Sequence, residues 1–223
     1  MVIRDLAVSD GITTLDLWRA IEARGVGARV TGTDLRLAVR YAEAGAGRGV
    51  SLSDGSVLQV EIGGVLYGRG HRDLSAAPVR AREGLEKALA GGGTATATML
   101  APEVEWAAGR TAGGLRFREE DAFDPDEDIG EADVIRVANL LVERTADHRG
   151  YYDRADIVAA LGRVGEKAKD GAHLYLNDFR KKVEHVGHWR KDGARGAWVR
   201  EPVGGVAADL AGVRDIAIDG KGG

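Results

Sequence analysis

The chain has 223 residues, and its 31 Lys and Arg residues against 35 Asp and Glu residues give a formal net charge of -4 at pH 7. This average excludes a protein that binds nucleic acid with its whole surface, but it allows a local basic patch. The absence of Cys excludes disulfides, thiolate metal sites and a cysteine nucleophile. No apolar stretch approaches ~18 residues and no signal peptide is visible, so we expect a cytoplasmic protein without membrane contact.

The first clear helix is predicted close to the start of the chain. Thr13 is a good helix cap, and Leu15, Trp18 and Ile21 follow near helical spacing. Gly25 is a good helix stop, so we expect the helix to lie between Thr13 and Gly25.

The next part of the chain carries signals for strands, one hairpin and a second helix. Alternating apolar residues after Thr33 favour a strand, although Thr33 also begins a pattern that suits a helix. Gly63 and Gly64 suit a tight hairpin turn, and Pro78 suits the first turn of a helix. This mixture predicts a small α+β domain over residues 1–118. The expected elements are strands at 35–41, 57–62, 65–67, 94–99 and 115–118 and a helix from Pro78 to about residue 91.

An acidic run follows this domain. Residues 119–128 hold seven acidic residues and no basic residue. Such a run repels itself and rarely packs. We therefore expect residues 119–132 to be a linker.

Three helical patterns and a hairpin follow the acidic run. The first pattern covers residues 134–141, the second begins at the cap Asp153, and the third covers residues 176–186. Two Trp-bearing segments around a Gly-rich, basic turn then predict a hairpin over residues 188–200. We expect residues 203–223 to form a Gly-rich tail.

Trp189 and Trp198 lie on the two strands of this hairpin. Such residues are able to stack on bases, as in proteins that bind single strands. Large aromatic side chains are more often buried, so we expect both to anchor a small core.

Three helices followed by a basic hairpin is the order of elements in the winged helix-turn-helix family, which residues 133–202 resemble. The stretch from Leu174 to Gly187 carries the resemblance, which implies that the third helix enters the major groove of duplex DNA. The long charged connection at residues 165–171 departs from a tight helix-turn-helix. The expected fold class is therefore α+β: an N-terminal α+β domain joined by an acidic linker to a winged-helix-like three-helix domain with a β-hairpin wing.

A fainter resemblance lies at the front of the chain. Residues 13–41 are similar to the helix-plus-hairpin docking domains of the TubC type, through the stretches 15–26 and 29–37. This resemblance implies a docking partner or a homodimer that forms through the N-terminal domain.

The basic and amide side chains of the third helix and the hairpin are the candidate DNA-binding residues. Arg and Asn pair with base edges, whereas Lys is mainly a charge for phosphate. Residues 180–200 hold seven basic residues against two acidic ones. The candidates are Asn177, Arg180, Lys181, Lys182, Arg190, Lys191 and Arg195.

No arrangement for catalysis, metal binding or cofactor binding stands out. The glycines of residues 45–49 follow no clear strand, so the dinucleotide-binding fingerprint fails. His185 and His188 offer only two neighbouring ligands for a metal. The acidic residues 124–128 begin like a calcium loop, but the Gly and the Glu that such a loop needs are missing. We therefore expect no catalytic residue, no metal, no cofactor and no enzyme.

The leading hypothesis is a DNA-binding protein with duplex DNA as its partner, either a transcriptional regulator or a replication or plasmid accessory protein. The alternative is a protein–protein interaction or assembly module that has a winged-helix shape and binds no nucleic acid. The acidic average and the docking-like front favour this alternative.

Overall fold

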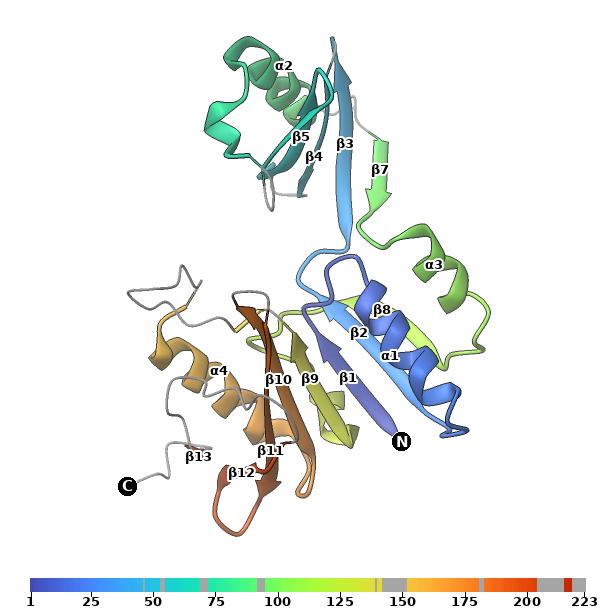
Figure 1. The fold of residues 1–223 in the computed structure, drawn as a ribbon, viewed down its shortest axis with the longest axis vertical. Coiled ribbons are helices and arrows are strands. Elements are labelled where there is room, and N and C mark those ends of the chain that lie inside the picture. The colour runs from blue at the N-terminus through green and yellow to red at the C-terminus, as the bar shows by residue number, and fades with distance from the viewer. Residues whose placement is uncertain are drawn as a thin grey trace. The chain divides into compact units, whose positions relative to one another are not determined.

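A computed structural model describes residues 1–45, 47–52, 55–68, 72–91, 95–138, 140–141, 152–180, 183–203 and 215–217 (Figure 1). The chain forms two compact units. The first unit contains Met1–Leu35 and Ala101–Gly223, and the second contains Arg36–Leu100. The second unit is therefore an insertion into the first, and residues 119–132 lie within the first unit.

The first unit is built on a mixed sheet of eight strands in the order β8-β2-β1-β9-β10-β11-β12-β13. The strands from β8 to β10 are parallel, and β11, β12 and β13 are each antiparallel to the strand before them. The strands are β1 (Val2–Leu6), β2 (Arg29–Asp34), β8 (Leu115–Glu119), β9 (Val134–Ala138), β10 (His173–Arg180), β11 (Val183–Asp192), β12 (Ala197–Glu201) and β13 (Asp215–Ala217).

Helices lie on both faces of this sheet. α4 (Arg154–Lys167) packs on one face, where Ile157, Leu161 and Val164 join the buried side chains of the strands. α1 (Ile12–Glu22) lies on the other face beside β1 and β9. The remaining helices of this unit are α3 (Pro102–Ala108) and the short η2 (Glu127–Glu131).

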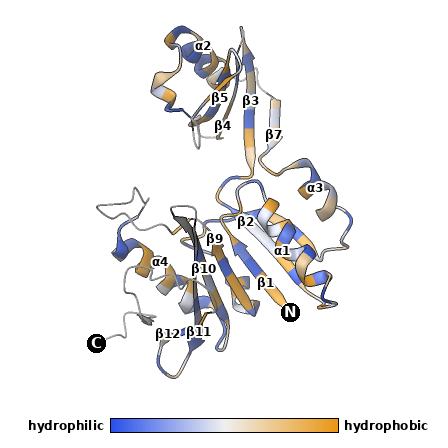
Figure 2. Cartoon of the chain, in the orientation of Figure 1, coloured by the Kyte–Doolittle hydropathy of each residue, from blue (hydrophilic) through white to orange (hydrophobic). Residues whose placement is uncertain are grey.

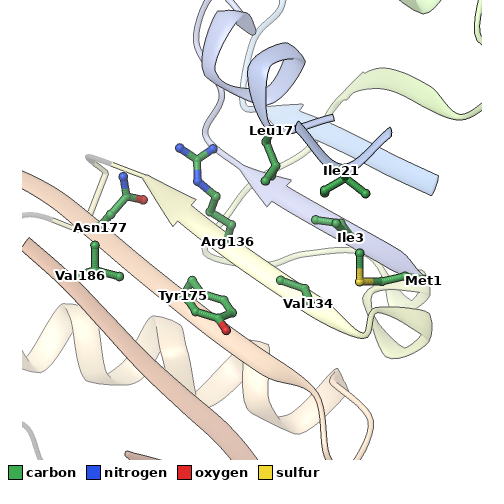
Figure 3. A pocket seen from close by; sticks show the side chains of 9 residues that line it. All are labelled: Met1, Ile3, Leu17, Ile21, Val134, Arg136, Tyr175, Asn177 and Val186. Atoms are coloured by element: carbon green, nitrogen blue, oxygen red, sulfur yellow. The ribbon is translucent and has the colours of Figure 1, made fainter. Parts of the chain in front are cut away.

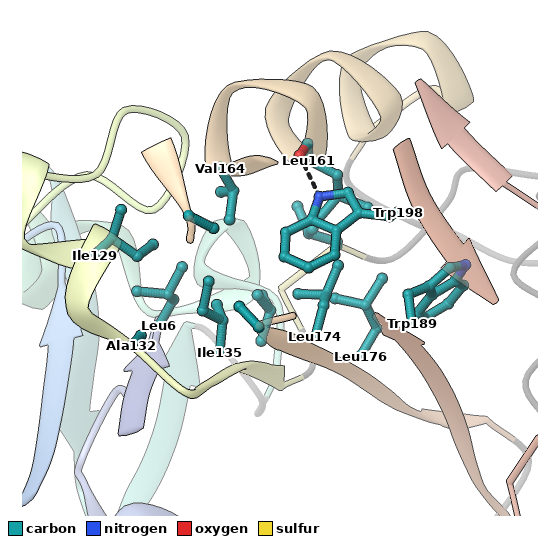
Figure 4. Close-up of a cluster of buried hydrophobic side chains, with 14 of the residues drawn as sticks. Leu6, Ile129, Ala132, Ile135, Leu161, Val164, Leu174, Leu176, Trp189 and Trp198 are labelled. Atoms are coloured by element: carbon teal, nitrogen blue, oxygen red, sulfur yellow. Dashed lines mark hydrogen bonds between the residues drawn. The ribbon is translucent and has the colours of Figure 1, made fainter. Parts of the chain in front are cut away.

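The core of the first unit lies between α4 and the sheet (Figure 4). Trp189 and Trp198 are fully buried there, which confirms the prediction that they anchor a core. The indole N–H of Trp198 donates to the backbone carbonyl of Leu161 on α4 at 2.9 Å. This bond satisfies the one polar atom that the side chain buries.

The second unit is an antiparallel sheet in the order β6-β5-β4-β3-β7, with α2 (Val79–Ala90) packed against it. A Cβ atom at Gly47 would lie 3.0 Å from a methyl group of Leu85, so glycine lets the helix approach the sheet closely. Gly63 and Gly64 have positive φ angles, as the predicted hairpin turn requires. The other elements are β3 (Ala38–Ala44), β4 (Gly47–Leu52), β5 (Val57–Ile62), β6 (Val65–Gly68), β7 (Ala95–Thr98) and η1 (Leu74–Ala76).

The expectation of an α+β protein with a winged-helix-like domain is wrong. Residues 134–138 form β9 rather than a helix, and residues 173–180 form β10. β9 lies between two other strands, and all its residues except Arg136 are apolar (Figure 2). Its sequence therefore lacks the alternation of polar and apolar residues that would indicate a strand. In β10, Leu174 and Leu176 face the core while Tyr175 faces the opposite side. The side chains of β10 therefore alternate between the two faces of the sheet. Apolar residues in the same stretch also fall at helical spacing, which led to the wrong prediction of a helix.

The resemblance of residues 13–41 to a docking domain is also wrong. β2 belongs to the sheet of the first unit, whereas β3 belongs to the sheet of the second. The two strands therefore form no hairpin. The predicted first helix, the helix after Pro78 and the helix capped by Asp153 are confirmed as α1, α2 and α4, although α1 begins at Ile12 and is capped by Gly11 rather than by Thr13.

Across the part of the chain that the structure describes, no helix is both long and apolar enough to cross a membrane.

Gly187 gives a test of how tightly the core of the first unit is packed. A Cβ atom there would lie 2.3 Å from the Trp189 ring, so Gly187→Ala forces the indole to shift. We expect the free energy of unfolding to fall by about 1–3 kcal/mol, as measured by urea denaturation. Gly27→Ala is the control, because a Cβ atom at this exposed position meets nothing within 4 Å. Equal stabilities of the two variants would contradict this packing.

Candidate functional site

The strand order of the first unit reverses at β1. From β1 the chain builds the sheet outward through β2 to β8, and it then returns to place β9 on the other side of β1. In open α/β sheets, ligands bind outside the carboxyl ends of the strands at such a reversal. The connection from β1 to α1, residues 7–11, lies at this place and is the candidate site.

Three residues of this connection have left-handed backbone conformations. Ala7, Ser9 and Gly11 have φ angles of 61°, 55° and 77°. Only Gly adopts this conformation without cost, and non-glycine residues that do so cluster at functional sites. The connection is therefore strained, and neighbouring groups must hold it.

Hydrogen bonds from both sides hold the strained connection. The Ser9 N–H donates to Asp34 Oδ2 at 2.8 Å, and the Val8 N–H donates to the carbonyl of Thr33 at 3.0 Å. On the other side, the Ala101 N–H donates to the carbonyl of Asp10 at 2.9 Å. Asp34 is the last residue of β2, so its carboxylate stands at the carboxyl edge of the sheet.

A carboxylate already occupies the start of α1. Asp10 Oδ1 accepts a hydrogen bond from the Ile12 N–H at 3.1 Å. A negative charge at the N-terminus of a helix is favourable, because the first N–H groups of a helix point outward. The same charge would repel a phosphate at this position.

Asp5 is buried beneath the first turn of α1, with 1% of its surface exposed. Its Oδ2 accepts hydrogen bonds from the Thr14 hydroxyl and from Arg136 Nη1, each at 2.7 Å. Its Oδ1 is buried and has no hydrogen-bond partner among the described residues. Burial raises the pKa of Asp5, although Arg136 and Thr14 act in the opposite direction.

An aromatic ring lies beside the connection. A Cβ atom at Gly32 of β2 would lie 2.6 Å from the Phe117 ring and 3.2 Å from a methyl group of Val8. Glycine at this position therefore lets Phe117 of β8 lie directly against the backbone of β2. The candidate site thus combines carboxylates, a strained loop and an apolar surface.

The candidate DNA-binding residues are not brought together on one helix. Asn177 and Arg180 lie on β10, Arg190 and Lys191 lie on β11, and Arg195 lies in the turn before β12; Lys181 and Lys182 lie outside the described residues. The Nε of Arg190 donates to Glu201 Oε1 at 3.1 Å, whereas Lys191 Nζ donates to the carbonyl of Ala168 at the end of α4. Consecutive strand residues point to opposite faces, so these two side chains share no surface.

No protein-family model and no curated protein matches the chain. Similar solved structures include the DszA carbon methyltransferase, with 12% identity and a TM-score of 0.38, where the match covers 82% of this chain and 30% of that chain. Phosphoethanolamine N-methyltransferase 2 of Haemonchus contortus has 12% identity and a TM-score of 0.35, with 87% and 26% covered. The aminoglycoside resistance methyltransferase NpmB1 has 14% identity and a TM-score of 0.33, with 81% and 56% covered.

The expectations of a DNA-binding protein, of a duplex DNA partner and of a protein–protein assembly module with a winged-helix shape are wrong. The recognition helix on which they rested is the strand β10. The expectation that the chain is no enzyme is withdrawn as well: it rested on the absence of a recognisable motif, whereas the open sheet places a candidate ligand site at residues 7–11.

The sequence carries a signal for the candidate site that the dinucleotide-binding fingerprint does not include. Val2–Leu6 is a short strand that combines apolar residues with Arg4 and Asp5, and Gly11 stands just before the helix. Ala7 and Ser9 occupy left-handed positions where a fingerprint search expects glycine. The third glycine of that fingerprint would fall at position 12, which is Ile12, so neither the residue types nor the full spacing match.

The strain at Ala7 predicts an unusual effect of a glycine substitution. Because Ala7 has a positive φ angle, Ala7→Gly removes a steric cost of about 1–2 kcal/mol, which exceeds the entropy cost of glycine. We expect the free energy of unfolding to rise by about 0.5–1 kcal/mol in urea denaturation. Ala20→Gly, at an exposed position within α1, is the control and should lower it by about 1 kcal/mol. A loss of stability in Ala7→Gly would contradict the left-handed conformation.

The raised pKa of Asp5 predicts a pH-dependent stability. The folded protein holds the Asp5 proton to a higher pH than the unfolded chain, whose usual pKa is 3.8. The contribution of Asp5 to the free energy of unfolding therefore falls as the pH rises from about 3.8 through the folded-state pKa. Asp5→Asn lacks this contribution, so its stability relative to wild type should rise with pH over that interval. Urea unfolding at a series of pH values measures the difference, and a constant difference would exclude a raised pKa.

Proposed function

We propose that the chain is a methyltransferase that binds S-adenosylmethionine at the carboxyl ends of β1 and β2. The observation that carries the proposal is the position of Asp34. An acidic side chain at the end of the second strand is the group with which α/β folds bind the hydroxyls of a ribose. Asp34 Oδ2 accepts the Ser9 N–H, and Oδ1 has no hydrogen-bond partner among the described residues.

The connection between β1 and α1 argues against a cofactor that contains a pyrophosphate. Dinucleotides need glycines at which the backbone approaches the phosphates closely, together with the unoccupied start of a helix. Ala7 and Ser9 carry side chains at two of these positions, and the carboxylate of Asp10 occupies the start of α1. A nucleoside without phosphate fits these residues better.

The charges around the connection favour a cationic ligand. Asp10 and Asp34 lie within or beside it, and the buried Asp5 Oδ1 accepts no hydrogen bond from the described residues. S-adenosylmethionine carries a sulfonium and an ammonium group, and these complement carboxylates. Bound there, it would supply an electrophilic methyl group for transfer to a nucleophilic acceptor.

The roles of the residues in this proposal follow from their positions. Asp34 would accept hydrogen bonds from the ribose hydroxyls, and Phe117 would offer an apolar surface beside the loop. Asp5 would hold the first turn of α1 in place through Thr14, and its Oδ1 would accept from a donor of the ligand. The hydrogen bonds to Asp34 and Ala101 would keep the loop in its binding conformation.

Binding of S-adenosylmethionine tests the proposal by isothermal titration calorimetry on the full chain. We expect S-adenosylmethionine and S-adenosylhomocysteine to bind and the dinucleotide NAD to show no binding. Asp34→Asn keeps an oxygen for the Ser9 N–H but loses the charge, so affinity should fall about tenfold or more. Transfer is then measured as S-adenosylhomocysteine released with a panel of small nucleophilic acceptors, and Asp34→Asn should lower this release.

Asp73→Asn is the matched control. Asp73 is an exposed carboxylate of the second unit that accepts hydrogen bonds from Ser75, so its loss removes the same charge elsewhere. Its affinity for S-adenosylmethionine should equal that of wild type. Binding of NAD without binding of S-adenosylmethionine would overturn the proposal.

A further inference from the structure

A cavity lies on the face of the sheet that carries α1 (Figure 3). It has a volume of about 360 Å³, within the range of pockets that bind small molecules. Its floor is formed by Ile3, Val134 and Val186, and Leu17 and Ile21 of α1 form one wall. Asp34 and residues 7–11 do not line it, so it is separate from the proposed cofactor site.

The cavity follows from the topology of the sheet. β10 and β11 are separated by only two residues, and they pair as an antiparallel hairpin. No helix fits into so short a connection, so none follows β10 to cover this face beside α1. The apolar side chains on this part of β9 and β11 therefore remain accessible.

One wall of the cavity is held rigidly by stacked rings. The ring of Tyr175 on β10 lies parallel to that of His188 on β11, with centroids 4.3 Å apart and planes 3° apart. His188 Nε2 in turn lies 2.8 Å from His173 Nδ1, within hydrogen-bonding distance. Fixed side chains give a ligand a preformed surface, which lowers the entropy cost of binding.

A positive charge stands at one end of this apolar cavity. Figure 3 shows the guanidinium of Arg136 and the amide of Asn177 at one end and Met1 at the other. Arg136 Nη1 donates to Asp5, and no acceptor contacts its other N–H groups within the described part of the chain. Only 18% of the Arg136 side chain is exposed, so water reaches these donors poorly. A partly buried cation with donors to spare favours an anionic partner.

We propose that this cavity binds a small molecule with an aromatic or aliphatic body and an anionic head group. The body packs against Ile3, Val134 and Val186, and the head group accepts hydrogen bonds from Arg136. The inference does not depend on the proposed cofactor, because the two sites are lined by different residues. A polypeptide strand does not suit the site, since β9 and β10 already have a hydrogen-bonded neighbour on each side.

Two fluorescent probes with the same body test the proposal on the full chain. Anilinonaphthalene sulfonate has two apolar ring systems and an anionic group, and phenylnaphthylamine has the same rings without the charge. We expect the sulfonate to bind saturably, with one molecule per chain, and about tenfold more tightly than the neutral probe. Arg136→Gln should remove this preference while the neutral probe keeps its affinity.

Cavity-filling variants keep the test decisive if Arg136→Gln does not fold. Val186→Trp and Ile21→Trp place a large ring in the cavity from partly exposed positions, so each should weaken both probes about tenfold or more. Leu66→Trp is the control, because Leu66 is a partly exposed residue of the second unit. It should bind both probes as wild type does.

Any of the following three results would overturn the proposal. Unchanged probe affinities in both cavity-filling variants would place the probes elsewhere, and equal affinities of the two probes for wild type would exclude an anionic ligand. Sedimentation that shows a dimer, with probe binding only after dilution, would assign this face to a second copy of the chain. Val186→Trp should bind S-adenosylmethionine as wild type does while it binds the probes more weakly. The two measurements therefore distinguish loss of the cavity from loss of the cofactor site.

Discussion

The buried carboxylate of Asp5 is the constraint on which the first unit depends. It lies where the strand order reverses, and one of its oxygens binds α1 through Thr14 and β9 through Arg136. A charge in this position is costly unless it is paired and hydrogen-bonded. The three elements must therefore come together correctly before the carboxylate can be buried, and the same group connects the first turn of α1 to Arg136, which lines the apolar cavity.

The candidate site shows how a loop can be shaped without the usual glycines. Ala7 and Ser9 adopt left-handed conformations because Thr33, Asp34 and Ala101 hold the neighbouring backbone. The strain is balanced by hydrogen bonds that come from β2 and from the residue just before α3. Such a loop is preorganised by its surroundings rather than by its own flexibility.

The sequence predicted the elements whose signals are local. The helix capped by Asp153, the turn at Gly63 and Gly64 and the buried Trp198 could all be read from short stretches. β9 could not, because all its residues except Arg136 are apolar, so no alternation in the sequence separates it from a helix. The candidate site could not be predicted either, since Ser9 and Asp34 lie 25 positions apart and meet only when β1 and β2 pair in parallel.

The two stretches of the first unit that flank the insertion are bound to a single loop of the same unit. The chain leaves the first unit just after Asp34, whose side chain binds Ser9, and it returns at Ala101, whose N–H binds Asp10. Segments whose ends lie this close together are tolerated as insertions, because their gain or loss does not alter the pairing of the strands around them. A unit inserted at this position can therefore be gained or lost while the parallel sheet of the first unit keeps its register.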